Sequence, residues 1–323
     1  AYTRFSLGTR FERAEAPDFF QFPSSLVILW SLSDMTIRCL TYSHELRSLN
    51  RFFMTRRLYE LSEFEPNVDD SEVWETFHDN SKVELHSPIV PPNEVLSRME
   101  QTSDSLEYSS RKQIPLLTAD NEDSSPCYQL IKKRVSERDW SLTEITFAEI
   151  SQLLEGYGVT RDNEDTEFIQ PFRAVPSGGG LFPLDLYISV RNCTDLDSGV
   201  YHYSPRSHSL NSAMRGDQTV ALAECFVQQD VVYHAAITVL ITGLFSRSTF
   251  KYGNRGYRFT LMEAGHLAQN FCLLATEMGL SNLCMGGYFD RRLDDFIGVD
   301  GVTQSVIYTF SAGRKLKTED SGL

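Results

Sequence analysis

The stretch from Phe259 to Met278 places apolar side chains on nearly every side of a helix, and Gly279 follows it directly. A helix that is apolar all round is buried in a core, and a glycine just after the last turn is typical of a helix that ends there. The sequence therefore predicts a globular protein built around one buried helix. With 323 residues the chain exceeds the roughly 100 to 200 residues usual for one domain, so we expect one large domain or two unequal ones.

Regular patterning on both sides of this helix predicts a main domain over residues 126–323. Helical spacing follows Thr143, which is the expected N-cap of a helix at 146–154. Further helices are expected at 217–228 and 291–297, and apolar runs predict strands at 184–190, 200–203, 236–244 and 306–310. This order indicates an α+β domain with a central sheet.

The first part of the chain predicts a small α+β N-terminal module over residues 1–100, followed by a linker over residues 101–125. Apolar runs occur at 26–30 and 37–40, and a basic helical stretch occurs at 52–61. Much of the polar, proline-containing stretch that follows is expected to be loop. An exposed strand in this module is a candidate for binding a peptide or partner enzyme by β-augmentation.

The charge of the chain argues against several classes of partner. A net charge of -14 repels phosphate backbones and anionic lipid, so nucleic acid is not an expected partner. The longest uncharged apolar run, 235–245, is shorter than the roughly 20 residues needed to cross a bilayer, so no membrane association is expected. A bound phosphate has to be held locally, by arginines and backbone N–H groups.

The six cysteines are scattered without a CxxC pair, and Cys272 and Cys284 lie in strongly apolar surroundings. This spacing favours buried thiols in a reducing compartment over a disulfide framework or a zinc site. The start of the chain shows no signal peptide. We therefore expect a cytoplasmic protein without a structural metal.

Two groups of residues are candidates for holding an anion. The glycines that follow Pro176 and Ser177 let backbone N–H groups approach a ligand closely, although the same pattern also fits a flexible hairpin entry. Arginine forks suit phosphate oxygens, and two distant basic segments could converge on one phosphate, although each alone also fits a solvated surface. These segments contain Arg134, Ser136, Arg138, Arg314 and Lys315.

Lys251 and Tyr252 form an amine–phenol pair on a loop that leads into the predicted buried helix. Desolvation at the edge of a core can tune such a pair for proton transfer. A lysine with its usual pKa of about 10.4 is a poor base at neutral pH, so burial or a neighbouring cation such as Arg255 would have to lower its pKa. Alternatively Tyr252 relays the proton while Lys251 stabilises negative charge. The sequence leaves both roles open.

Five motifs in residues 126–315 together resemble the nitroreductase superfamily of FMN-dependent oxidoreductases, and within it the SagB-type dehydrogenases. They are the Arg-x-Ser-x-Arg segment at 134–138, Pro-Ser-Gly-Gly at 176–179, Lys-Tyr with Arg-Gly-Tyr-Arg at 251–258, Glu-x-Gly-x-x-x-Gln-Asn at 263–270 and Gly-Gly-x-x-Asp at 286–290. The resemblance implies a nitroreductase-like fold, with a central, mostly antiparallel sheet flanked by helices. It also implies FMN as cofactor and a homodimer with helix 259–278 in its interface.

The resemblance also implies roles for single residues. Lys251 and Tyr252 are expected to be catalytic, and Arg255, Tyr257 and Tyr288 are expected to line the substrate side. The expected cofactor-binding residues are Arg134, Ser136, Arg138, Pro176, Ser177, Gly178, Gly179, Gln269, Gly286, Gly287, Arg314 and Lys315. One departure from the family pattern is Val135, which stands where many members carry a second arginine.

Family members of this type oxidise thiazolines and oxazolines to thiazoles and oxazoles during peptide natural-product synthesis. The resemblance implies the same reaction here: a hydride passes to N5 of FMN, a proton passes to the Lys251–Tyr252 pair, and O₂ reoxidises the flavin. The implied partners are an azoline-containing peptide or carrier-bound substrate and a cyclodehydratase or synthetase complex. Two alternatives stay open, an NAD(P)H-dependent nitroreductase or flavin reductase and a non-catalytic docking subunit of a peptide-modifying complex.

Overall fold

The computed structural model describes residues 26–31, 36–41, 71–88, 90–103, 105, 111–117, 125–163 and 170–316. The chain divides into two units, Ala1–Glu65 and Pro66–Leu323. This division differs from the predicted boundaries at residues 100 and 126. The physical reason is that helix α2 (Ser71–Asn80) packs against the helix that follows the Lys–Tyr pair, so it belongs to the larger unit.

In the N-terminal unit the structure describes one hairpin. Strands β1 (Leu26–Ser31) and β2 (Thr36–Thr41) pair antiparallel, with Leu26 opposite Thr41. These strands coincide with the two apolar runs of the sequence. The predicted helical stretch at 52–61 lies outside the described residues.

The larger unit contains a seven-stranded sheet among its described residues. Neighbouring strands pair antiparallel throughout, which confirms the predicted α+β class with a mostly antiparallel sheet. The strand predicted at 184–190 has the bounds of β7. In spatial order the strands are β10 (Ser209–Arg215), β9 (Gly199–Ser204), β7 (Leu184–Val190), β11 (Ile237–Leu244), β13 (Gln304–Lys315) and β12 (Leu280–Met285), with β3 (Trp140–Ser141) on the end of β13.

Shorter elements surround this sheet. Two small ladders pair β4 (Ile145–Thr146) with β8 (Cys193–Thr194) and β5 (Val159–Asn163) with β6 (Gln170–Arg173). Three short helices lie outside the two helix layers that cover the sheet. They are α3 (Pro92–Glu100), which buries no residue, α4 (Pro126–Lys133) and the single turn η1 (Gly178–Gly180).

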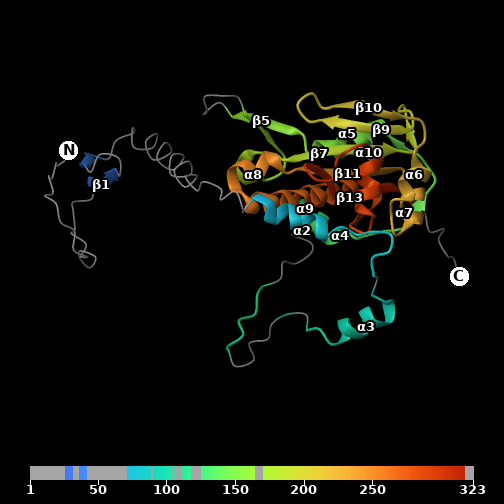
Figure 1. The fold of residues 1–323 in the computed structure, drawn as a ribbon, viewed down its shortest axis with the longest axis horizontal. Helices are drawn as coiled ribbons and strands as arrows, with labels where there is room; N and C mark the ends of the chain where they lie inside the picture. Colours follow the sequence, from blue (N-terminus) through green and yellow to red (C-terminus); the bar gives the residue numbers. More distant parts are fainter. Residues whose placement is uncertain are drawn as a thin grey trace. The chain divides into compact units, whose positions relative to one another are not determined.

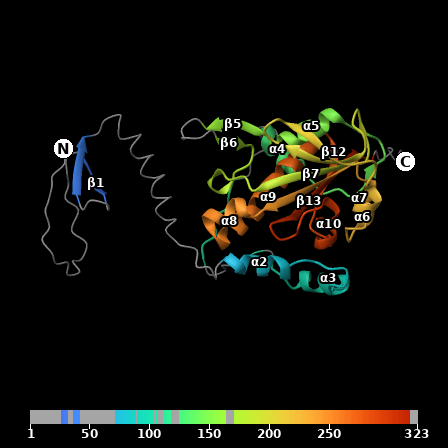
Figure 2. The ribbon, with the colours of Figure 1, turned by 45° about the horizontal axis from the view of Figure 1, so that its top comes forward.

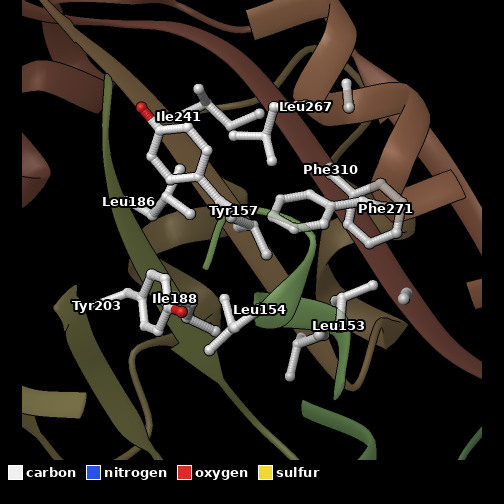
Figure 3. Packing of buried hydrophobic residues seen from close by; sticks show 14 of the residues in the cluster. Leu153, Leu154, Tyr157, Leu186, Ile188, Tyr203, Ile241, Leu267, Phe271 and Phe310 are labelled. Atoms are coloured by element: carbon white, nitrogen blue, oxygen red, sulfur yellow. The ribbon is translucent and has the colours of Figure 1, made fainter. Parts of the chain in front are cut away.

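Helices cover both faces of the sheet (Figures 1 and 2). Helices α5 (Phe147–Glu155) and α9 (Asn254–Glu277) pack on one face, where Tyr157, Phe271 and Phe310 form the centre of the core shown in Figure 3. The other face carries α6 (Thr219–Ala223), α7 (Gln229–His234) and α10 (Asp290–Ile297). Each large apolar side chain buried in these cores stabilises the fold by about 1.5–3 kcal/mol.

Helix α9 confirms the predicted buried helix, with two differences. It begins at Asn254, before the predicted Phe259, and it ends at Glu277. Gly279 follows with φ +69°, the left-handed conformation that ends helices, as predicted. One side of α9 stays exposed, including Met262, His266 and Gln269, so the helix is not buried all round.

Two other helix predictions need correction. The N-cap of α5 is Thr146, not Thr143, because Thr146 forms a reciprocal capping box with Glu149 while Thr143 bonds to Ser141. The helix predicted at 217–228 is shorter in the structure, where α6 ends at Ala223 and the next helix, α7, begins at Gln229, beyond the predicted range. Its backbone leaves the helix because the N–H of Val227 bonds to the carbonyl of Gly287.

Candidate functional site

The glycine turn and the Lys–Tyr pair, far apart in sequence, meet in the structure. Gly179 lies in η1 with φ +67°, and a Cβ added there would lie 2.4 Å from Tyr252 Oη and 3.1 Å from Lys251 Nζ. A Cβ contact under 3.0 Å is not tolerated without movement, and the left-handed backbone is itself strained for other residues. Glycine is therefore favoured at this position for both reasons.

The neighbouring elements hold the amine and the phenol in place. Lys251 and Tyr252 end helix α8 (Ser246–Tyr252), and Gly253, with φ +52°, turns the chain into α9. The Tyr252 ring meets the Phe259 ring edge-on at 5.0 Å, and Lys251 Nζ lies 5.4 Å from the centre of the Tyr252 ring. Both side chains are half-buried. The pair is accessible but fixed.

A buried polar cluster lies behind the glycine turn. Tyr157 Oη lies 3.0 Å from Glu263 Oε1 and 3.2 Å from the carbonyl oxygen of Leu184, and the guanidinium of Arg173 lies 4.3 Å from the centre of the Tyr157 ring. Burial raises the pKa of Glu263, while hydrogen bonds from Ser177 and Tyr157 and the charge of Arg173 offset part of that rise. The sequence motif included Glu263, but nothing in the sequence assigned this cluster a place beneath the glycine turn.

A cavity of about 260 Å³ brings together three of the predicted cofactor residues, Arg138, Gly286 and Gly287. A Cβ on Gly286 would meet open space, so its backbone is accessible to a ligand. A guanidinium beside exposed backbone suits an anionic group. The other residues that line the cavity are Val227, Gln228, Leu283, Cys284 and Met285.

The basic residues near this cavity do not all converge as predicted. Arg134 donates to Ser136 Oγ at 3.3 Å, and Lys315 Nζ reaches Glu137 Oε1 at 2.6 Å, so the end of β13 does lie near the 134–138 segment. Arg314 points elsewhere, because successive side chains of a strand lie on opposite faces.

Arg314 instead forms a two-pronged ion pair with α5. Its two Nη atoms each lie 2.7 Å from an Oε atom of Glu149, and its Nε donates to the carbonyl of Glu144 at 3.1 Å. Although burial raises the pKa of Glu149, hydrogen bonds from Thr146 and Arg314 lower it below its ordinary value. The structure therefore gives Arg314 a structural partner, and we leave it out of the proposed cofactor site.

The tyrosines predicted to line the substrate side are buried in the fold. Tyr257 Oη lies 3.2 Å from His78 Nδ1, and its ring stacks on Trp74 at 5.6 Å. Tyr288 donates to the carbonyl of Val306 at 3.2 Å, and burial raises the pKa of its hydroxyl. These positions differ from the prediction, because both side chains fill cores rather than an open face. The predicted Arg255 and Gln269 lie exposed on α9.

Segment 71–88, placed by the sequence in the N-terminal module, covers the start of α9. The N–H of Trp74 donates to Asn254 Oδ1 at 3.1 Å, and its ring lies 5.0 Å from that of Phe245. The N–H of Val83 donates to Asp290 Oδ2 at 2.8 Å. The aspartate of the Gly-Gly-x-x-Asp motif therefore binds this segment to the start of α10. A single tryptophan in a polar stretch gave no sequence signal strong enough to predict this contact.

The two groups of site residues come from different elements of the larger unit. Lys251 and Tyr252 end α8, whereas Val227 and Gln228 of the cavity lie between α6 and α7. Figures 1 and 2 both show α8 at one end of the sheet and α6 and α7 at the other. Lys251 and Tyr252 are not among the residues that line the cavity.

The described residues include no group of three His, Cys, Asp or Glu side chains placed to hold a metal ion. Among the described helices, none combines the length and apolar character needed to cross a membrane.

Comparison with protein families finds that the model of the Nitroreductase family matches residues 131–314. The putative nitroreductase MJ1384 of Methanocaldococcus jannaschii is 32% identical over 58% of this chain and 90% of its own length. The microcin B17-processing protein McbC of Escherichia coli is 31% identical over 40% of this chain, which spans about half (49%) of McbC.

Among solved structures, one chain of the E. coli microcin synthetase McbBCD complex with truncated pro-MccB17 bound matches with a TM-score of 0.63. The match covers 80% of this chain and 98% of that one at 21% identity. At this identity the likeness shows a shared fold.

Proposed function

Because this chain belongs to the nitroreductase family, as its motifs predicted, we propose that it is an FMN-dependent oxidase that converts thiazoline or oxazoline rings of a peptide to thiazoles or oxazoles. Its relative McbC is a microcin B17-processing protein, and the solved McbBCD complex holds a truncated pro-MccB17. The observation that carries the proposal is the meeting of Gly179 with Lys251 and Tyr252, which brings an amine and a phenol, both half-buried, against the backbone of the glycine turn.

The residues of the cavity fit the cofactor. Arg138, with Arg134 and Ser136 beside it in sequence, would hold the phosphate of FMN, and Gly286 and Gly287 leave their backbone open to its ring system. When bound, FMN supplies a two-electron acceptor for a hydride. The cavity volume of about 260 Å³ lies just below the roughly 300–1,000 Å³ of small-molecule sites, which fits a site that a second chain completes.

We propose that a second copy of the chain completes the site. The lining of the cavity in one chain does not include Lys251 or Tyr252, and α9 keeps one side exposed, with 51% of Met262 exposed to solvent. A two-fold dimer with its axis near this helix would place the catalytic pair of each copy over the cavity of the other.

Mixed dimers test this arrangement. Lys251→Ala and Arg138→Ala should each be inactive alone, but co-expressed together they form mixed dimers in which one of the two sites carries no substitution. Random pairing makes half of the dimers mixed, so we expect recovery of about a quarter of the wild-type activity. If light scattering shows a dimer but the co-expressed variants stay inactive, each site lies within one chain, and the proposed sharing of sites between the two copies is wrong.

In the proposed reaction the substrate loses a proton from the ring carbon next to the peptide carbonyl and a hydride from the neighbouring CH₂. Lys251 Nζ lies 5.4 Å from the centre of the Tyr252 ring, so one residue of the pair can take the proton while the other stabilises the negative charge that develops. Gly179 lets the backbone close over the pair and reduces the room for water. Which residue is the base stays open.

A direct assay tests the activity. Purified protein incubated with a thiazoline-bearing peptide should reduce the peptide mass by about 2 Da per ring, because two hydrogens leave. Lys251→Ala should lower the rate by about 10²-fold or more, and Tyr252→Phe separates proton relay from packing because it keeps the ring. Full turnover by Lys251→Ala with FMN bound would contradict the assigned pair.

A second candidate is an NAD(P)H-dependent nitroreductase or flavin reductase. It is favoured by the likeness to MJ1384, a putative nitroreductase matched over 90% of its length. Rapid loss of the flavin absorbance on addition of NAD(P)H would support this function. Slow bleaching, together with azoline oxidation, would support the first.

The N-terminal unit is the proposed place for a peptide or a partner enzyme. Its hairpin of β1 and β2 offers strand edges for β-augmentation. Removal of residues 1–65, which leaves the larger unit intact, should weaken binding of the precursor peptide. Unchanged affinity would eliminate this role. A cytoplasmic location also stays a prediction.

A further inference from the structure

Two cysteines from different elements lie side by side in the larger unit. Cys272 on α9 and Cys284 on β12 are both free thiols, and their Sγ atoms are 3.4 Å apart. Disulfide formation requires the sulfurs to approach to about 2.05 Å, which small side-chain rotations can supply when the sulfurs already face each other. The pair is therefore placed for a reversible covalent link between helix and sheet edge.

The electrostatic surroundings make the two sulfurs unequal. The hydrogen bond from Cys284 lowers the pKa of Cys272 even though Cys272 is buried, and the positive charge of Arg134 adds to this effect. The same hydrogen bond and burial raise the pKa of Cys284. Since the thiolate is the nucleophilic form of cysteine, the pair contains one activated sulfur and one that holds the proton.

The pair is also accessible from outside. Cys284 is half-buried and belongs to the lining of the cavity next to Arg138 and Gly286. The other described cysteines differ: Cys127 is exposed, and burial raises the pKa of both Cys193 and Cys225 to about 11. A small oxidant that enters the cavity therefore reaches the one close thiol pair of the described residues.

We propose that Cys272 and Cys284 are a redox-sensitive thiol pair that a hydroperoxide converts to a disulfide. One thiolate sulfur takes an oxygen atom from hydrogen peroxide, which gives a sulfenic acid and hydroxide. The second thiol then displaces that oxygen as water and forms the S–S bond, so two thiols and one peroxide give one disulfide and two waters. The oxidation is independent of the proposed azoline activity, although reoxidation of a flavin by O₂ would supply peroxide at this place.

The test uses the full chain in its native state. Purified protein is treated with equimolar hydrogen peroxide, its free thiols are blocked, and its peptides are analysed by mass spectrometry. We expect one linked pair of peptides, containing Cys272 and Cys284, about 2 Da lighter than the two reduced peptides together, and its disappearance on treatment with dithiothreitol.

Matched variants control for unspecific oxidation. Cys284→Ser removes the linked pair, whereas Cys193→Ser, which changes a thiol that donates to the carbonyl of Thr194, leaves it in place. A wild-type protein that keeps both thiols, or that gives only sulfinic acid on a single cysteine, would overturn the proposal. A link of either cysteine to Cys127 or Cys225 would overturn it as well, because it would show that the chain had opened.

Discussion

Replacement of Gly179 by alanine separates backbone strain from steric contact with the catalytic pair. A left-handed backbone destabilises a residue with a Cβ by about 1–2 kcal/mol. Alanine also restricts the unfolded chain more than glycine does, and this effect stabilises the folded state by about 0.4–1 kcal/mol. Strain alone therefore destabilises the variant by about 1 kcal/mol. The new Cβ would also lie 2.4 Å from Tyr252 Oη, so the tyrosine has to move and its edge-on contact with Phe259 is weakened, at a cost of about 0.5–1.5 kcal/mol.

Gly216 provides the matched control. It has φ +80°, and a Cβ there would meet nothing within 4 Å, so Gly216→Ala carries the strain without the contact. For a domain of this size 1 kcal/mol shifts Tm by about 2–4 °C. We expect that shift for Gly216→Ala and about twice that shift for Gly179→Ala.

The rate of azoline oxidation gives the second measurement. A displacement of about 1 Å at a reacting group can lower a rate by about 10²-fold, so Gly179→Ala should lose activity to that extent while Gly216→Ala keeps it. Equal Tm values and equal rates for the two variants would refute the reasoning, because the contact with Tyr252 would then have no effect.

Three further predictions concern stability. Thr146→Ala should cost about 1 kcal/mol in urea unfolding, while Thr143→Ala should stay within about 0.5 kcal/mol. Burial lowers the pKa of His78 to about 4 in the folded protein, whereas the unfolded chain keeps a histidine pKa of about 6.5. As the pH is lowered from about 6.5 to 4, the unfolded state therefore binds a proton that the folded state does not, and the protein loses at most about 3 kcal/mol of stability. His78→Gln should not show this loss. Burial raises the pKa of Glu263 above its ordinary value of 4.5, so its carboxyl destabilises the fold as pH rises from that value through the raised pKa. Glu263→Gln should therefore gain stability relative to wild type as pH rises, and parallel curves of stability against pH would contradict this.

Much of the larger unit could be predicted from sequence because its elements carry strong local patterns. β7 carries regularly spaced apolar residues and α9 ends just before a glycine, and both signals depend only on neighbouring residues. The resemblance gave the glycine turn and Lys251 separate roles, and the structure adds that the two lie in contact.

The features that the sequence did not reveal depend on long-range packing. Arg314 and Lys315 are adjacent cations in the sequence, but strand geometry directs them to opposite faces, and only the fold shows that Glu149 takes one of them. Tyr257 sits in a motif that suggests chemistry, yet it is buried by Trp74 from a segment that has little local pattern. Local sequence patterns cannot predict a contact between two residues that lie so far apart in the chain.

The position of α2 bears on how a shortened protein has to be designed. The family match begins at residue 131, and a fragment cut there would lose the helix that covers Phe245 and Tyr257. Both rings would then face water a few residues from Lys251, and the turn between α8 and α9 would lose its anchor at Asn254. A fragment that starts at Pro66 keeps this cover, and we expect it to remain monodisperse where the shorter fragment aggregates.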